Sequence, residues 1–131
     1  MVEGYSIEKK RHVDFLNDLF HTAYKGWYKC CWNYDEKTLV WFVRFDNYKR
    51  TGYRNTIDES KGILCQENVD GKRYWNGKPI NDASQIRLVF SVVNDGIKRK
   101  YIFKGVYQYI AGISDPFGKE YFRKVASEYA L

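Results

Sequence analysis

The segment DNYKRTGYRN, residues 46–55, combines side chains that suit a flat, negatively charged ligand. Lysine and arginine bind phosphate groups, and each tyrosine ring that stacks on a nucleic-acid base contributes roughly 1–3 kcal/mol. The segment therefore predicts a loop that binds phosphates and stacks on a base, or else a solvated loop whose charges serve only solubility. Its cations and rings are Lys49, Arg50, Arg54, Tyr48 and Tyr53.

Other aromatic residues stand beside cations or within hydrophobic runs. Buried Tyr and Trp need partners for their O–H and N–H groups, so not all of the 12 Tyr and 4 Trp can be buried comfortably. The alternative is an aromatic-rich β core bordered by Lys and Arg side chains that extend to water. The predicted phosphate-binding residues are Lys49, Arg50, Arg54, Arg73 and Lys78, and the predicted base-stacking residues are Tyr48, Tyr53, Trp75, Trp32 and Trp41.

The sequence patterns that would indicate a catalytic site are weak. The densest acidic stretch, TIDESKG, holds Asp58 and Glu59, and Glu67 follows in CQENV. A metal-dependent nuclease would place Glu-x-Lys on a strand beside a second carboxylate, and CQENV lacks the lysine. We expect Asp58 and Glu59 to close a turn, and a nuclease whose carboxylates converge only in three dimensions stays a less favoured alternative.

Metal and cofactor sites are not indicated either. His12 and His21 lie nine residues apart on a predicted helix, where about 100° per residue places them on opposite sides. The sequence has no glycine-rich phosphate loop of the Walker or dinucleotide type. We therefore predict no catalytic residue, no metal site and no cofactor.

The overall charge and the cysteines limit the classes of protein that are compatible with the sequence. A net charge of +6 suits a polyanionic partner without identifying one. Adjacent Cys30 and Cys31 would point to opposite faces of a strand, so with Cys65 they are predicted to be buried or half-buried free thiols of a reducing compartment. Because no apolar run approaches the ~20 residues that cross a bilayer, and the N-terminus is polar, we expect an intracellular, cytoplasmic protein.

Hydrophobic periodicity places the elements that would position the site. Apolar residues at intervals of three and four predict an amphipathic helix from Ser6 to about Tyr24, ended by Gly26. Alternation with period two then predicts a series of strands, and both faces of 38–45 are apolar, as in a central strand. The tail fits a helix or a short strand. The predicted strands are 27–34, 38–45, 62–69, 86–93 and 98–110, with a further short hairpin at 73–80.

These elements predict one α+β domain over residues 1–131. Its sheet would be a curled antiparallel β-sheet or small β-barrel, packed by the N-terminal amphipathic helix. Gly105, inside the long strand 98–110, predicts a bulge or bend where the sheet curls. Tyr101, Phe103, Tyr107 and Tyr109 are expected to line one face of that strand.

Two segments of the C-terminal half carry a family resemblance. KYIFKGVY, residues 100–107, and the later EYFRKVA resemble the R-Y-x-F-x-G-V-Y strand and the following Y-x-R-V element of PUA-like and SRA-like domains, which accompany bacterial HNH-type restriction nucleases that act on modified DNA. The resemblance implies a curled β-barrel that flips a modified base into an aromatic-lined pocket, with the nuclease in another domain. The matching residues are Lys100, Tyr101, Phe103, Gly105, Val106, Tyr107, Phe122, Arg123 and Val125.

The sequence therefore favours a non-catalytic reader of double-stranded DNA that recognises a modified base by base flipping. Its partners would be double-stranded DNA and a nuclease domain or subunit. A small protein-interaction module, such as an inhibitor or immunity protein of a bacterial conflict system, is the alternative from another class.

Overall fold

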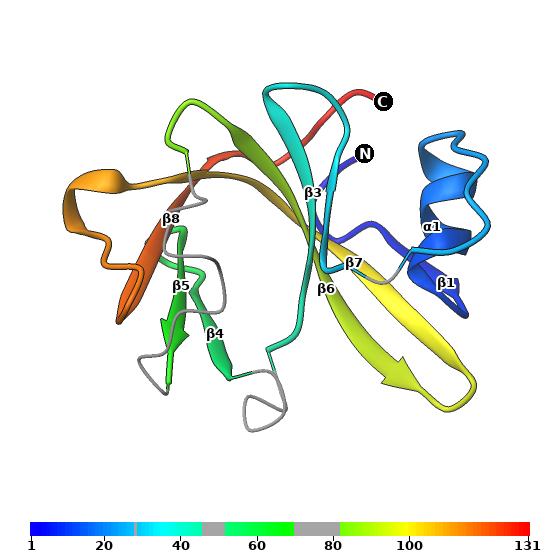
Figure 1. The fold of residues 1–131 in the computed structure, drawn as a ribbon, viewed down its shortest axis with the longest axis horizontal. Helices are drawn as coiled ribbons and strands as arrows, with labels where there is room; N and C mark the ends of the chain where they lie inside the picture. The colour runs from blue at the N-terminus through cyan, green and yellow to red at the C-terminus, as the bar shows by residue number, and fades with distance from the viewer. Residues whose placement is uncertain (28, 46–51, 70–81) are drawn as a thin grey trace.

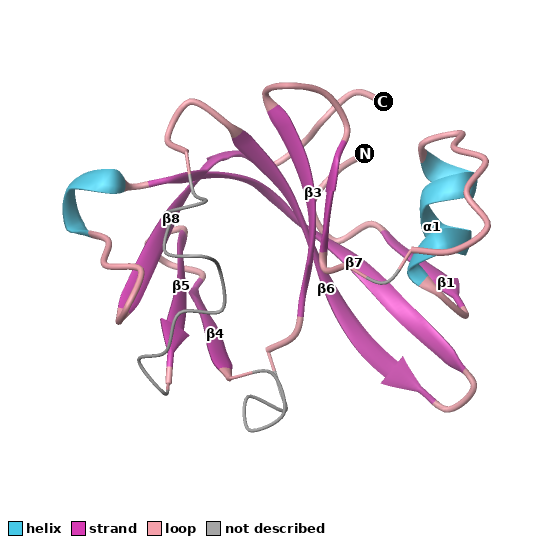
Figure 2. Ribbon diagram, in the orientation of Figure 1, coloured by secondary structure: helices cyan, strands magenta, loops and turns pink. Residues whose placement is uncertain are grey.

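The computed structural model describes residues 1–27, 29–45, 52–69 and 82–131 (Figures 1 and 2). The described part is mainly β structure with one α-helix at its N-terminal end. In chain order the elements are β1 (Ser6–Lys9), α1 (His12–Leu19), β2 (Cys31–Asn33), β3 (Thr38–Val43), β4 (Tyr53–Asp58), β5 (Ile63–Asn68), β6 (Ile86–Asp95), β7 (Lys98–Tyr109), a short 3-10 helix (Ala111–Ile113) and β8 (Lys119–Ala126).

The strands form one curled sheet, as predicted. Its order is β2-β3-β6-β7-β8-β5-β4, and β1 pairs with β7 outside this path. All described strand pairs are antiparallel except β3 and β6, which pair in parallel. Figure 1 shows β4, β5 and β8 on one side of the central strands and α1 on the other. The curled sheet packed by an N-terminal helix is thus confirmed, with one parallel pair that the hairpin signals did not indicate.

Strand β3 separates two hydrophobic cores because its side chains alternate between the faces of the sheet. Val40 and Phe42 join the core on the side of α1, where Phe15 of the helix is fully buried. Trp41 and Val43 join the second core, on the opposite side of β3. All six residues of β3 are buried, as expected for a central strand.

Gly105 marks the predicted bulge. Its φ is +116°, a backbone conformation that favours glycine, and the β6–β7 register shifts between Val89 and Phe90. The extra residue reverses the alternation along β7, so Phe103 lies in the helix-side core and Tyr107 in the second core. The prediction that the aromatic residues of this strand share one face is therefore wrong.

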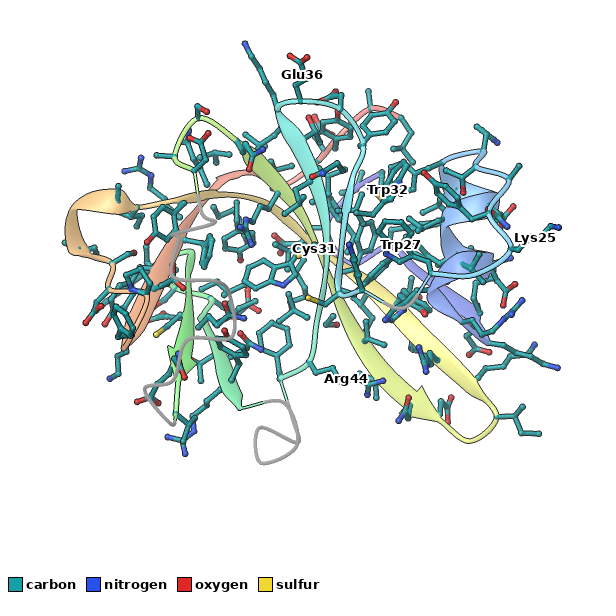
Figure 3. All side chains as sticks on the ribbon, in the orientation of Figure 1. Lys25, Trp27, Cys31, Trp32, Glu36 and Arg44 are labelled. Carbon is teal, nitrogen blue, oxygen red and sulfur yellow. The ribbon has the colours of Figure 1, made fainter. Side chains whose placement is uncertain are left out.

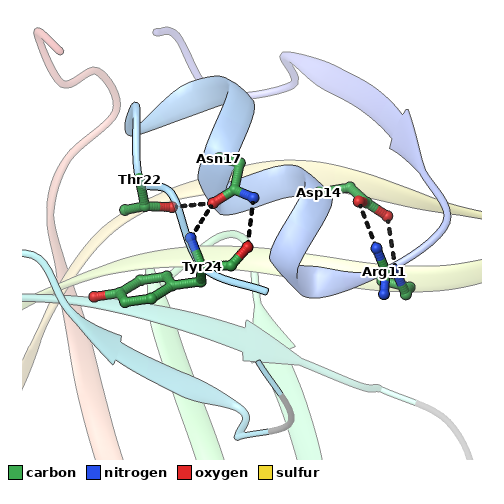
Figure 4. A network of polar contacts seen from close by, with 5 residues as sticks. All are labelled: Arg11, Asp14, Asn17, Thr22 and Tyr24. Atoms are coloured by element: carbon green, nitrogen blue, oxygen red, sulfur yellow. Dashed lines mark hydrogen bonds and ion pairs between the residues drawn. The ribbon is translucent and has the colours of Figure 1, made fainter. Parts of the chain in front are cut away.

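The N-terminal helix is shorter than predicted. Residues 6–9 form β1, which pairs antiparallel with β7, so Ser6 is not the helix cap. The helix begins after Arg11, whose guanidinium donates to both carboxylate oxygens of Asp14 at 3.1 and 3.2 Å (Figure 4). Tertiary pairing with β7 outweighs the helical pattern over the first turn.

The helix also ends early, at Leu19, and Gly26 plays no part in its end. His21 has a φ of +56°, which departs from helical geometry. The Asn17 side chain then fixes the connection, because its Oδ1 accepts from the Thr22 hydroxyl at 2.6 Å and from the Tyr24 amide at 3.1 Å (Figure 4).

The C-terminal tail adopts the strand alternative. Strand β8 pairs with both β5 and β7. Beyond it, the Tyr129 amide donates to the Met1 carbonyl at 2.8 Å, and Val2 forms a β-bridge with Glu128. Within the described ranges, no helix has the length and apolar character needed to cross a membrane.

Candidate nucleic-acid interface

A cavity of about 290 Å³ opens between β3 and β4, beside the start of α1. Small-molecule sites range from about 300 to 1,000 Å³, so this volume suits one small planar group. Strand β3 contributes Trp41 and Phe42 to its lining, and β4 contributes Tyr53 and Asn55. The two strands are distant along the sheet path, and the curl of the sheet brings them together.

The Trp41 side chain is held in place by the side chains that pack against it. Trp41 is only 3% exposed, and the Arg87 guanidinium lies 4.8 Å from the centres of both the Trp41 and Phe122 rings. Cation–π contacts of this kind hold a ring in one orientation. Tyr53 is half-buried at the start of β4. Trp41 thus forms a fixed wall, and Tyr53 is the more accessible ring.

Asn55 supplies an unsatisfied polar group. Its Nδ2 donates to the Arg44 carbonyl at 2.9 Å, while its Oδ1 is buried without a hydrogen-bond partner among the described residues. The whole residue is 8% exposed. A buried amide oxygen without a partner costs about 1–3 kcal/mol. Gln66 lies opposite Asn55 in the β4–β5 register and also lines the cavity, so two carboxamides face the same space.

His12, the first residue of α1, lines the cavity beside Phe42. Its ring stacks on Phe42 with 4.2 Å between ring centres, and its Nδ1 lies 2.7 Å from the Tyr101 hydroxyl. Burial, with the positive charges of Arg99 and Arg44 acting in the same direction, lowers the pKa of His12 to about 4. His12 is therefore a neutral hydrogen-bonding group near pH 7.

Within the described ranges, the lysine or arginine that lines the cavity is Arg44, which was not among the predicted cations. Arg44 follows β3 directly, lines the cavity and donates to Asn94 Oδ1 at 3.3 Å. Figure 3 shows Arg44 at the end of β3, away from α1. Arg54 lies on β4 and forms an ion pair with Glu67 at 3.3 Å, with 46% of its side chain exposed. Arg44 therefore supplies positive charge at the cavity, whereas Arg54 alternates with Tyr53 and Asn55 along β4 and faces the other side of the sheet, where it pairs with Glu67.

The predicted site residues fall into three groups. Tyr53 and Trp41 line the cavity, and Arg54 lies next to Tyr53 on β4, so the segment 46–55 ends in a strand. Trp32 is 7% exposed in the helix-side core and donates to the Tyr24 hydroxyl at 3.1 Å, so it does not line this cavity (Figure 3). Six predicted residues lie outside the described ranges: Tyr48, Lys49, Arg50, Arg73, Trp75 and Lys78.

The acidic residues considered for catalysis have structural partners. Asp58 Oδ1 accepts from the backbone amides of Ser60 and Lys61, which closes the β4–β5 turn as predicted. Glu59 pairs with Lys104 at 3.0 Å. Within the described residues, no group of three or more His, Cys, Asp or Glu side chains could hold a metal ion.

Sequence reasoning missed His12, Asn55 and Gln66 as lining residues. The sequence holds one indication for Asn55, because asparagine is uncommon in strands and its presence in one suggests a specific role. The sequence contains no comparable indication for His12 or Gln66, because only the curl of the sheet brings them to β3. The two adjacent cysteines were misread: their Sγ atoms lie 3.8 Å apart, because β2 begins only at Cys31 and strand alternation does not apply to Cys30.

The comparisons with known proteins agree with this architecture. The sequence profile of the SET and RING associated domain family, abbreviated SRA, matches residues 6–131. Among solved structures, the 5-hydroxymethylcytosine-specific restriction enzyme AbaSI is similar over 95% of this chain, with a TM-score of 0.69 and 25% sequence identity. The chain spans 40% of the length of that enzyme. No curated protein matches the sequence.

Proposed function

Because this chain belongs to the SET and RING associated domain family, we propose that it binds DNA and reads a modified base. The similar solved structure is that of a restriction enzyme specific for 5-hydroxymethylcytosine, so a modified cytosine is the first ligand to test. The observation that carries the proposal is the cavity between β3 and β4, with its aromatic wall and the unpartnered oxygen of Asn55.

The proposed reading step takes the base out of the DNA stack. Extrusion costs a few kcal/mol, and stacking on an aromatic ring returns roughly 1–3 kcal/mol per base. Tyr53 supplies the accessible ring, with Tyr48 and Trp75 as further candidates outside the described residues. Trp41 and Phe42 close the cavity and exclude water from the bound base.

Polar contacts would then identify the base. Cytosine presents an N4 amino group as a donor. Asn55 Oδ1 is a buried acceptor that such a donor would satisfy. The Gln66 carboxamide offers both a donor and an acceptor, which suits the remaining edge of a pyrimidine or a hydroxyl substituent.

Cations at the rim would hold the flanking phosphates and set the register of the DNA. Arg44 is the described candidate at the cavity, and Lys49, Arg50, Arg54, Arg73 and Lys78 are the candidates from the sequence. The proposal assigns no catalytic step to this chain. Cleavage would come from a separate nuclease domain or subunit.

A gel-shift panel of cytosine- and adenine-modified duplexes tests the proposal. We expect tighter binding to a duplex with 5-hydroxymethylcytosine than to its unmodified counterpart. Tyr53→Ala should remove this preference by loss of a stacking ring. Tyr5→Ala is the matched control, because Tyr5 is 44% exposed and does not line the cavity.

Reversing the charges at 49, 50 and 54 together should weaken binding to every duplex alike. Failure to bind any of the duplexes at low salt would remove the reader function. Metal-dependent cleavage of a labelled oligonucleotide that Asp58→Ala or Glu67→Ala abolishes would instead show that the chain is itself a nuclease.

A further inference from the structure

Two neighbouring thiols stand at the edge of the cavity. Cys30 is exposed, precedes β2 and lines the cavity, whereas Cys31 is half-buried and packs against the second core. Their Sγ atoms lie 3.8 Å apart, within reach of an S–H···S hydrogen bond. The backbone holds this arrangement, because the Phe42 amide donates to the Cys30 carbonyl at 2.7 Å.

The surroundings of the two thiols make them chemically different. The hydrogen bond from Cys31 lowers the pKa of Cys30 to about 7, against the opposing effect of burial, and the charge of Arg87 acts in the same direction as the hydrogen bond. The same hydrogen bond, together with burial, raises the pKa of Cys31 well above its ordinary value. Cys30 is therefore the more readily deprotonated of the two thiols, and the thiolate is the nucleophilic form of cysteine.

We propose that Cys30 is a modification site for small-molecule disulfides, and that the adduct closes the cavity. The Cys30 thiolate attacks one sulfur of the disulfide, a new S–S bond forms, and the other half leaves as a thiolate that takes up a proton. Cys31 stays protonated and is slow to displace the adduct. The attached group then occupies the space proposed for the base, so the effect on DNA binding rests on the proposed function.

The third cysteine provides a matched comparison. Cys65 is half-exposed on β5, and burial raises its pKa. It lies outside the lining of the cavity. Thiolate fraction favours Cys30 over Cys65, whose pKa is raised, while the lower basicity of Cys30 offsets part of that gain. The net expectation at pH 7 is a reaction several-fold faster at Cys30 than at Cys65.

The first experiment measures the thiol chemistry without DNA. The protein is treated with oxidised glutathione, and intact-mass spectrometry with peptide mapping follows the adduct at each cysteine. The fast phase should map to Cys30, disappear in Cys30→Ser and persist in Cys65→Ser. Equal or faster reaction at Cys65 would overturn the assignment of Cys30.

The pH dependence of this rate tests the role of Cys31. The titratable and charged groups that face Cys30 are Cys31 and Arg87, while His12 and Arg44 line the same cavity. His12 stays neutral over the range used, because its pKa is about 4. The Cys30 rate should inflect near pH 7, and Cys31→Ser should move this inflection upward. An inflection above about pH 8.5 in the unaltered protein would contradict activation by Cys31.

The second experiment asks whether the adduct closes the cavity. The glutathione adduct should bind a 5-hydroxymethylcytosine duplex at least tenfold more weakly than the reduced protein, and dithiothreitol should restore binding. The affinity of Cys30→Ser for the duplex should be the same before and after treatment with the disulfide. If the adduct and the reduced protein bind the duplex with equal affinity, the proposal that the adduct closes the cavity is overturned. If the reduced protein binds no DNA, the proposed function and closure both fail, whereas the rates in the first experiment still decide the thiol site.

Discussion

Single side chains determine what the cavity can recognise. Most of its lining is apolar or already hydrogen-bonded, and Asn55 Oδ1 is the buried lining oxygen without a partner in the described part of the chain. A ligand that donates a hydrogen bond there would satisfy a group that folding alone leaves unpaired. This residue therefore offers a direct test of base recognition.

Replacing Asn55 with alanine should weaken binding to the modified duplex about 5- to 100-fold, because the base would lose its buried acceptor. Fluorescence anisotropy with modified and unmodified duplexes measures the effect. Asn68→Ala is the matched control, since Asn68 is a buried asparagine of β5, 6% exposed, outside the cavity lining. Equal losses in the two variants would mean that Asn55 acts only through stability.

His12 should make the stability of the fold depend on pH. Its folded-state pKa of about 4 lies below the ordinary value of 6.5, so the native state favours the neutral ring. The resulting stability is fully present above pH 6.5 and is lost as pH falls through 4. Partial exposure limits the amount to on the order of 2–3 kcal/mol.

Urea unfolding of the unaltered protein and His12→Phe, at several pH values between 7 and 4, isolates this contribution. Phenylalanine keeps the stack on Phe42 but loses the contact with the Tyr101 hydroxyl, so the variant should be about 1 kcal/mol less stable at pH 7. The difference should shrink and reverse as pH falls. A constant difference across the range would show that His12 does not titrate with folding.

Among the elements, the bulge in β7 has the largest effect on the shape of the site. It places Tyr101 and Phe103 in the helix-side core and Tyr107 and Tyr109 in the other core. A Cβ at Gly105 would lie 3.1 Å from the Ala126 carbonyl oxygen of β8, in a conformation that L residues rarely adopt. Because a β-bulge bends its strand, Gly105 contributes to the curl of the sheet.

Gly105→Ala should therefore lower the free energy of unfolding by about 2–3 kcal/mol. Chemical denaturation followed by tryptophan fluorescence measures the change. Gly112→Ala is the control, because a Cβ at Gly112 would meet no atom within 4 Å and its φ is not positive. That variant should stay within about 0.5 kcal/mol of the unaltered protein. A similar loss in both variants would contradict a special role for the bulge.

The elements also show what a sequence can and cannot predict here. Period-two alternation located β3, β5, β6 and β7, because hairpin turns and buried apolar faces leave local signals. The helix was placed too early and too long, since the pairing of β1 with residues 99–102 is a contact that no local pattern records. The parallel pairing of β3 with β6 was not predicted, for the same reason.

The site was less predictable than the fold. Tyr53 and Arg54 were predicted from the mixture of rings and cations in 46–55, and the structure places Tyr53 in the lining of the cavity. Trp32 was assigned to the site because a tryptophan in an alternating run can face either side of the sheet, and its position in the helix-side core depends on α1. Cavity residues from separate elements meet only after the sheet has curled.

The whole molecule carries a net charge of +6, which should govern its encounter with DNA. If it contacts about five phosphates, the logarithm of affinity should fall with the logarithm of salt concentration with a slope of about −4 to −5. Arg44→Gln should reduce the magnitude of this slope by about 1, because Arg44 lines the cavity.

Lys61→Gln is the matched control for this titration. Lys61 lies in the turn after β4, at the opposite end of that strand from Tyr53, so the slope should not change. Affinities should be measured at salt concentrations of ~50–300 mM, the range in which counterion release is measurable. A slope near zero would indicate that the positive charge does not contact DNA.

The parallel pairing of β3 and β6 also affects how this chain folds on the ribosome. Thr38 pairs with Ile86, so during synthesis at roughly 5–20 residues per second the first strand waits about 2–10 seconds for its partner. Throughout this interval the nascent chain carries an apolar strand without its inner neighbour. Chaperones that bind extended hydrophobic segments during translation should therefore engage residues 38–43 until the later half of the sheet has been made.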